Sequence, residues 1–148
     1  MAETAREIDF PAMDTGSPSP ILVWGDAAYL LYYGPAKADS EVVIVVKFEG
    51  ALAALTGPPS DESLMNHRLW GKGLRFYSVH VVDESEWLRD LVRRDSHRTS
   101  PGWVLSHTHY LFTFHDQTIE CLARGHRWQE RHTSMSEALA EVTGSVGG

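Results

Sequence analysis

The chain has 148 residues, of which 43% are hydrophobic and 22% are charged. This length suits one domain, and the apolar fraction excludes a wholly disordered chain. Twenty acidic residues against thirteen basic ones give a net charge of -7, which argues against a nucleic-acid partner. The single cysteine, Cys121, excludes an intramolecular disulfide framework.

The two ends of the chain have the composition of loose segments. Residues 1–19 carry prolines and acids, and residues 144–148 are rich in glycine. We expect a flexible N-terminal segment over 1–19, one domain over 20–143 and a flexible tail over 144–148. No stretch reaches the roughly 18 apolar residues that cross a bilayer, and no secretory signal is visible. We therefore expect no membrane partner and a cytoplasmic location.

The first half of the chain alternates short apolar runs with turn residues. Residues 21–24 and 28–33 flank Gly25 and Asp26, a pattern that predicts a β-hairpin. Residues 42–49 are β-branched at most positions. Apolar side chains on both faces of this run predict a central strand that is covered on both sides.

The middle of the chain mixes helical and extended patterns. We expect a helical turn over residues 51–55, a short helix over residues 60–66 and a strand over residues 74–82. Asp83 and Glu86 have the spacing of a capping box, which predicts that Asp83 caps an amphipathic helix.

The last third of the chain predicts a loop over residues 96–102, a hairpin of residues 107–114 and 118–124, and a helix over about 134–142. Tight turns between neighbouring strands favour antiparallel pairing over a repeat of parallel strands and helices. We therefore expect an α+β fold, with a mostly antiparallel sheet of about six strands and three short helices.

The last predicted hairpin separates an apolar face from a face rich in titratable groups. We expect Phe114 to lie opposite Ile119, and side chains alternate between the two faces of each strand. Cys121 then falls on the core face, where a thiol is a poor nucleophile. The opposite face holds the side chains that could carry chemistry, which are His107, His109, Glu120 and His126.

His115, Asp116 and Glu120 are the predicted acid–base residues. A carboxylate beside an imidazole fixes its tautomer and supports proton transfer, the arrangement that general acid–base catalysis uses. Asp116 is also explained as an ordinary turn residue, because aspartate side chains bond to nearby backbone groups. Both interpretations stay open, but turn chemistry leaves Glu120 unexplained.

A second interpretation of the same face is a metal site. His107, His109 and His126 would converge from neighbouring strands, and three imidazoles suit zinc or another divalent metal. A change of one residue in the turn would move His126 to the other face, because strand side chains alternate. Histidines of this kind are also common as ordinary structural residues.

Five side chains, His109 among them, are candidates for contact with a substrate. His109 and His80 would orient it through hydrogen bonds, although a buried structural role also fits His80. Trp70, Tyr77 and Trp103 would form apolar walls, and structural packing is the competing explanation for both tryptophans.

Three segments of the chain carry a family resemblance. They are Gly57-Pro-Pro-Ser-Asp-Glu, a segment with His67, Leu69, Gly73 and Leu74, and His109-Tyr-x-Phe-x-Phe-His-Asp-x-Thr-x-Glu-Cys121. In these segments the chain resembles a family of small bacterial proteins of uncharacterised function. The resemblance covers about residues 21–124, and its most specific part is the last motif. It implies a bacterial soluble domain.

Two functions are compatible with these patterns. The first is a small-molecule-binding domain that acts as an enzyme on a small organic substrate, through acid–base or metal-assisted chemistry. The second is a non-enzymatic protein-interaction or dimerisation module, in which the strand over residues 42–48 and the group Tyr29, Tyr32 and Tyr33 form a homodimer seam or a surface for another partner.

Overall fold

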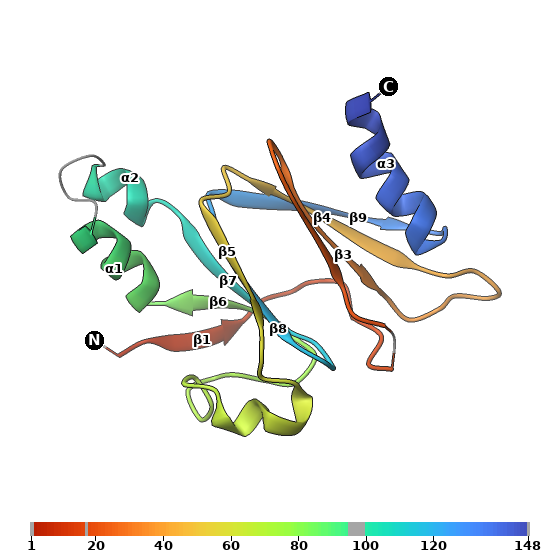
Figure 1. The fold of residues 1–148 in the computed structure, drawn as a ribbon. Helices are drawn as coiled ribbons and strands as arrows, with labels where there is room; N and C mark the ends of the chain where they lie inside the picture. The colour runs from red at the N-terminus through yellow and green to blue at the C-terminus, as the bar shows by residue number, and fades with distance from the viewer. Residues whose placement is uncertain (1, 17, 95–99, 148) are drawn as a thin grey trace.

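The computed structural model describes residues 2–16, 18–94 and 100–147. Within these residues, nine strands form two antiparallel sheets, and helices pack on their outer faces (Figure 1). The expected α+β class is confirmed, but the strands divide into two sheets rather than one. None of the helices in the described part of the chain is long and apolar enough to cross a membrane.

The larger sheet has five strands in the order β1-β6-β7-β8-β5, and all of its pairs are antiparallel. Its strands are β1 (Thr4–Glu7), β5 (Ala53–Gly57), β6 (Val79–Asp83), β7 (Thr108–Thr113) and β8 (Thr118–Ala123). The smaller sheet has the order β2-β3-β4-β9. Its strands are β2 (Ile21–Trp24), β3 (Ala28–Tyr33), β4 (Val43–Glu49) and β9 (Gly125–Arg131).

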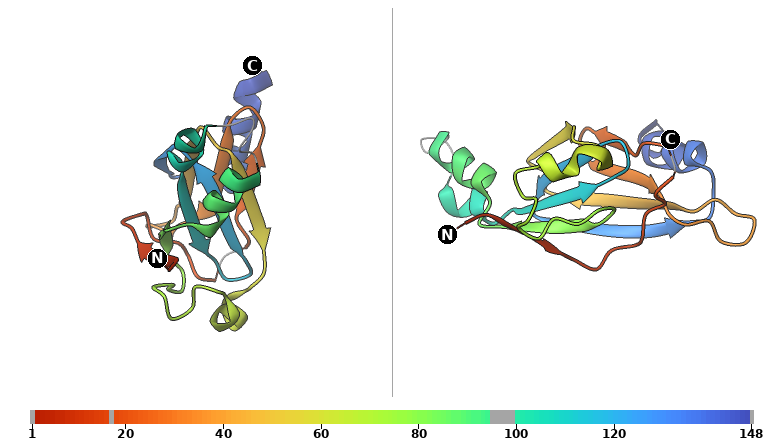
Figure 2. Two further views of the ribbon diagram at one scale, coloured as in Figure 1. Left: turned by 90° about the vertical axis from the view of Figure 1, so that its left-hand side faces the viewer. Right: turned by 90° about the horizontal axis from the view of Figure 1, so that it is seen from below.

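The helices cover the outer faces of the two sheets. They are the 3-10 helix η1 (Asp61–Asn66) and the α-helices α1 (Glu86–Arg94), α2 (Pro101–Leu105) and α3 (Met135–Gly147). Apolar side chains of α3 contact the outer face of the smaller sheet, whereas η1, α1 and α2 cover the outer face of the larger one. Figure 2 shows α1 and α2 at one end of the molecule and α3 at the other.

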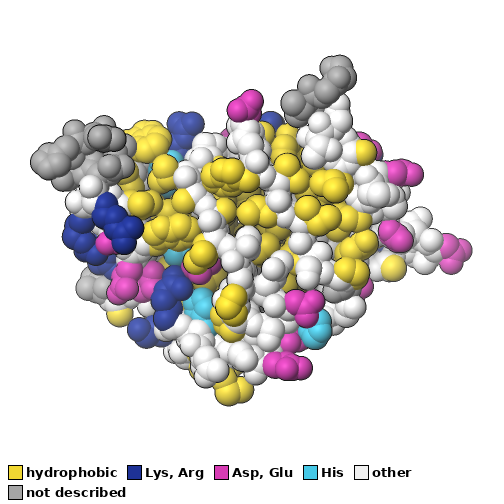
Figure 3. All heavy atoms as spheres, in the orientation of Figure 1, with side chains coloured by type: hydrophobic (Ala, Val, Ile, Leu, Met, Phe, Trp, Pro, Cys, Tyr) yellow, Lys and Arg dark blue, Asp and Glu magenta, His cyan; other side chains and the backbone are white. Residues whose placement is uncertain are grey.

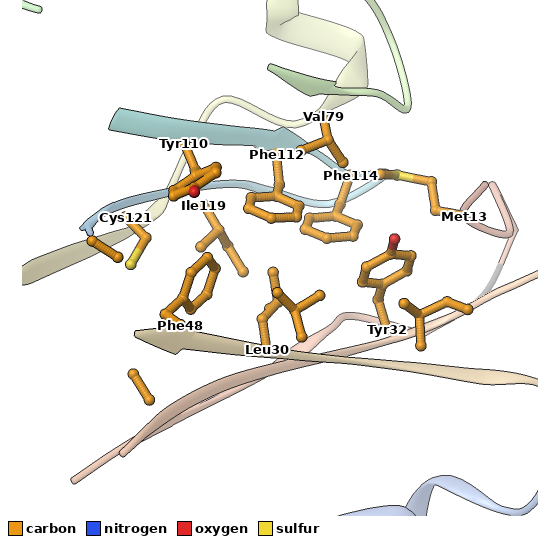
Figure 4. Packing of buried hydrophobic residues seen from close by; sticks show 14 of the residues in the cluster. Met13, Leu30, Tyr32, Phe48, Val79, Tyr110, Phe112, Phe114, Ile119 and Cys121 are labelled. Carbon is orange, nitrogen blue, oxygen red and sulfur yellow. The ribbon is translucent and has the colours of Figure 1, made fainter. Parts of the chain in front are cut away.

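The core lies between the two sheets. Aromatic and aliphatic side chains of β7 and β8 meet those of β3 and β4 across it (Figure 4). Phe112 is fully buried, and its ring lies 6.0 Å from that of Phe48 and stacks on that of Phe114. The predicted core face of the last hairpin is therefore confirmed. Burial raises the pKa of Cys121 to about 12, which agrees with the expectation that its thiol is a poor nucleophile.

The register of this hairpin differs from the expected one by two residues. Ile119 pairs with Phe112 rather than with Phe114, because a four-residue loop closes with a hydrogen bond from the Phe114 N–H to the Gln117 carbonyl. A shift of two residues leaves every side chain on its predicted face, since strand side chains repeat with a period of two.

Several predicted elements differ from the structure. The expected helical turn over 51–55 is wrong, because Ala53–Gly57 pairs with β8 as an edge strand. Only the last part of the expected strand 74–82 is extended. Of the expected loop 96–102, residues 96–99 lie outside the described residues, and the remainder begins α2. Helix α3 continues to Gly147, into the segment expected to be a flexible tail.

The N-terminal segment contributes a strand, which differs from the flexible lead-in expected over residues 1–19. Strand β1 pairs with β6, and the Ala5 N–H donates to the Lys72 carbonyl at 2.8 Å. Gly73 makes this approach possible, because a Cβ atom at Gly73 would lie 1.8 Å from the Ala5 carbonyl oxygen. The close approach places Glu3 over the outer face of the larger sheet.

Much of the expected homodimer seam is covered within the chain itself. Strand β4 is central in its sheet, and the core covers one of its faces while α3 packs against the other. Tyr32 is 1% exposed, and its hydroxyl donates to the Pro11 carbonyl at 2.7 Å. Strand β4 and Tyr32 are therefore mostly interior, whereas Tyr29 and Tyr33 are half-buried.

Candidate functional site

A buried pair of titratable groups lies on the outer face of the larger sheet. Strands β7 and β8 place His109 and Glu120 on that face. The exposed fraction is 1% for the residue His109 and 4% for Glu120. The His109 Nε2 lies 2.7 Å from the Glu120 Oε1. Strand alternation predicts this shared face.

Arg68 joins this pair to the N-terminal strand. Its Nη2 donates to the Glu120 Oε1 at 3.0 Å, and its Nε donates to the Glu3 Oε1 at 3.1 Å. The second oxygen of Glu3 accepts from the Glu86 backbone N–H, at the start of α1. Two buried carboxylates therefore share one guanidinium, and one of them also satisfies a free amide of the helix.

Ser85 completes the chain of hydrogen bonds. Its Oγ lies 2.7 Å from the His109 Nδ1 and accepts from the Leu88 N–H at 3.2 Å. Ser85 therefore caps α1, in place of the predicted cap Asp83, which ends β6. Between the strand and the cap, Glu84 has a φ of 57°, in the left-handed region. The chain thus turns sharply from β6 into α1, with Ser85 at the bend.

The charge of Glu120 defines the hydrogen-bond directions in this network. Burial alone would raise its pKa, but hydrogen bonds from His109 and Arg68 outweigh burial and lower the pKa of Glu120 to about 2. Glu120 is therefore an ionised acceptor. In the neutral imidazole we assign the proton to the His109 Nε2, which leaves Nδ1 to accept the Ser85 hydroxyl proton.

A groove of about 480 Å³ opens beside these groups. We call it the β6–β7 groove, because β6, α1, α2 and β7 form its walls. Its lining includes the network residues Ser85 and His109, the apolar side chains Val81, Leu88 and Leu105, and the polar side chains Arg6, Arg89, His107 and Thr108. The serine–imidazole pair is therefore at the wall of a hollow that is large enough for a small organic molecule.

The three histidines expected to bind a metal do not converge. His126 lies in β9 of the smaller sheet, where its Nδ1 accepts from the Tyr110 hydroxyl at 2.9 Å. The His107 Nδ1 donates to the Trp103 and Val104 carbonyls. The chain passes from the larger sheet to the smaller one between β8 and β9, whereas the predicted hairpin continues to His126 on a single sheet. Among the described residues, no group of three or more His, Cys, Asp or Glu side chains is arranged to hold a metal.

The predicted acid–base trio divides between two places. His115 and Asp116 lie in the loop between β7 and β8, whereas Glu120 belongs to the buried network. The His115 Nδ1 donates to the Asp61 Oδ2 at 2.7 Å, and the Tyr77 hydroxyl donates to the same oxygen. The hydrogen bond to Asp61 raises the pKa of His115, and the bonds from Tyr77 and His115 lower the pKa of Asp61.

The predicted substrate contacts are also dispersed. His80 is fully buried, and its ring joins the Leu111 carbonyl to the Arg75 N–H, so its role is structural. Trp70 packs against Phe76 at the surface. The Tyr77 hydroxyl is hydrogen-bonded to Asp61. The Trp103 ring packs on the ring of His107, with 4.7 Å between the ring centroids. Of the predicted set, only His109 lies in the network.

Sequence reasoning missed three members of the network, Glu3, Arg68 and Ser85. Glu3 and Arg68 reach the site from segments that are distant in sequence, and no local pattern indicates this. Ser85 had a usable signal, because serine is favoured immediately before the first turn of a helix. The capping-box spacing of Asp83 and Glu86 directed the prediction to the wrong cap.

Comparison with protein-family models, curated proteins and solved structures finds no match for this chain. In the geometry of the site, the segments around Asp61 and Arg68 meet the hairpin of β7 and β8, because Asp61 contacts His115 and Arg68 contacts Glu120.

Proposed function

We propose that the protein is a small-molecule-binding domain and an enzyme in which His109, oriented by Glu120, acts as a general base in the β6–β7 groove. The observation that carries the proposal is the buried His109–Glu120 pair at the wall of a groove of about 480 Å³. Of the acid–base residues predicted from the sequence, the proposal retains Glu120, as the group that orients the base.

The geometry supports this role in two ways. The carboxylate of Glu120 accepts a hydrogen bond from the His109 Nε2–H. The lone pair of the His109 Nδ1 is therefore directed toward Ser85, a residue of the groove wall. The size of the groove is within the range of small-molecule sites, about 300–1,000 Å³. The substrate is therefore a small organic molecule, and a cytoplasmic setting suits the single, buried thiol of Cys121.

A substitution that fills the groove tests this proposal. Leu105 lies in its lining and is 54% exposed, so Leu105→Trp will narrow the groove with little effect on folding. Ligand-observed NMR with a library of small organic acids, esters and amides will identify compounds that bind the wild-type protein. We expect Leu105→Trp to weaken their binding by about tenfold, or about 1.4 kcal/mol.

The matched control is Gln129→Trp, because Gln129 lines a different groove, between the smaller sheet and α3. This variant should bind the same compounds with wild-type affinity. Binding that is insensitive to Leu105→Trp, or that is lost equally in both variants, contradicts the proposal.

A second candidate function is self-association through a surface other than the expected seam. Hydrophobic side chains gather across the middle of the face in Figure 3, where β5 and β3 lie in Figure 1. Leu55 of the edge strand β5 is 56% exposed, and Trp24 of the edge strand β2 is 51% exposed. Edge strands present unpaired backbone groups that can pair with another chain.

Light scattering coupled to size-exclusion chromatography tests this candidate. If a second copy covers β5, the wild-type protein will elute as a dimer and Leu55→Lys as a monomer. Met65→Lys is the control, because Met65 is similarly exposed (61%) but lies in η1. A wild-type monomer, or a dimer that survives Leu55→Lys, excludes this interface.

A further inference from the structure

We propose that Ser85 is a base-activated nucleophile, and that the β6–β7 groove hydrolyses esters of short, apolar carboxylic acids. This inference rests on the proposed function, because it needs His109 as the base. It adds the reaction class and the substrate class, which the base alone does not define.

Ser85, His109 and Glu120 form a continuous relay. The Ser85 Oγ lies 2.7 Å from the His109 Nδ1, and the His109 Nε2 lies 2.7 Å from the Glu120 Oε1. A nucleophile in contact with a base, and a base oriented by a third group, is the arrangement that activates a serine hydroxyl. Arg68 in turn holds the Glu120 carboxylate at 3.0 Å.

Helix capping alone does not account for this arrangement. A capping serine needs only the bond from the Leu88 N–H, which is present at 3.2 Å. The imidazole on its other side adds nothing to the cap, and burying an imidazole and a carboxylate carries a desolvation cost. The relay therefore has a feature that the structural role of Ser85 does not require.

The backbone around Ser85 has a conformation that suits a nucleophile. It lies at a sharp bend between a strand and a nine-residue helix, directly after Glu84, whose φ of 57° is costly for a residue with a side chain. The Leu88 N–H and the start of α1 direct partial positive charge toward the Oγ. Both would stabilise negative charge that develops there as the hydroxyl loses its proton.

The lining of the groove indicates the substrate class. The apolar side chains Val81, Leu88 and Leu105 lie in the same groove as Ser85, and they suit a short hydrocarbon chain. The serine and its base provide the chemistry for a carbonyl carbon. An ester of a short, apolar carboxylic acid combines these two features.

The reaction balances with water as the only co-substrate. The Ser85 Oγ forms a bond to the ester carbonyl carbon as its proton moves to the His109 Nδ1. The bond from that carbon to the alcohol oxygen then breaks, and His109 returns the proton to the departing alcohol. Water attacks the acyl-serine through the same base, the proton passes back to the Ser85 Oγ, and the carboxylic acid leaves.

Covalent labelling tests the nucleophile directly. An alkyl fluorophosphonate should add one phosphonyl group to the wild-type protein, located at Ser85 by peptide mass spectrometry. Ser85→Gly should not be labelled, and its hydrolysis of p-nitrophenyl butyrate should fall by at least about 100-fold. Glycine is tolerated at helix caps, so this variant should keep its fold, which thermal unfolding will check.

Ser106→Ala is the matched control. Ser106 is an exposed serine whose hydroxyl donates to the Trp103 carbonyl, and this variant should be labelled and active like the wild type. The inference is overturned if the wild-type protein is not labelled at Ser85, or if Ser85→Gly hydrolyses the ester at the wild-type rate. If ligands still bind in a manner sensitive to Leu105→Trp, only the nucleophile is wrong. If that sensitivity is also missing, the proposed function fails with it.

Discussion

Replacement of Arg68 by methionine should lower the free energy of unfolding by about 3 kcal/mol at pH 8. Arg68 is the cation between Glu3 and Glu120, whose side chains are only 4% and 6% exposed. Removal of one partner from a buried ion pair costs about 3–5 kcal/mol, because the remaining charge is buried without compensation. The Arg68 side chain is 44% exposed, so water will compensate in part, and the lower end of that range applies.

Urea-induced unfolding followed by circular dichroism will measure this effect. Arg93→Met is the matched control, because Arg93 pairs with Asp90 at the surface of α1, and its side chain is 70% exposed. Surface ion pairs contribute about 0–1 kcal/mol, so the control should change stability by less than about 1 kcal/mol. Equal effects of the two substitutions would show that Arg68 does not hold the network together.

Acidification from pH 6 to pH 2 should remove about 3 kcal/mol of stability through Glu120 alone. The pKa of this carboxyl is about 2 in the folded protein and near 4.5 when it is free. A carboxyl whose pKa is lowered by folding stabilises the native state above its unfolded pKa. That stabilisation is lost as the pH falls toward the folded pKa, because the unfolded chain takes up the proton first.

Unfolding measured at a series of pH values will isolate this contribution. In Glu120→Gln the stability should fall less steeply with acid than in the wild type, because the variant has no carboxyl to protonate at this position. Glu62→Gln, at the exposed surface of η1, should keep the wild-type slope. A parallel pH dependence of the wild type and Glu120→Gln would contradict the contribution assigned to Glu120.

Strand alternation predicted the faces of the last hairpin, and with them the shared position of His109 and Glu120. It did not predict the register, because turns that differ by two residues give the same two faces. The helical turn expected over residues 51–55 failed for another reason. That segment is extended because it pairs with β8, and a single edge pairing leaves no trace in the local sequence.

The limits of the site prediction have similar causes. His115 lies two residues beyond Thr113, the last paired residue of β7, so it sits in the loop near Asp61 and not beside Glu120. Strand alternation also predicts His126 on the same hairpin, but the chain crosses to the other sheet before this residue. The contact between Arg68 and Glu120 joins residues that are 52 positions apart, and local periodicity carries no information at that distance.

The carboxylate of Glu3 has a mechanical consequence for the whole molecule. Strand β1 has only four residues at a sheet edge, and such a strand would fray if backbone pairing alone held it. The Glu3 carboxylate accepts hydrogen bonds from Arg68 and from the first amide of α1, and these two bonds hold the strand at the sheet edge. Detachment of β1 would leave the first amide of α1 without its acceptor, directly beside Ser85 in the groove wall, so the N-terminal strand supports the groove.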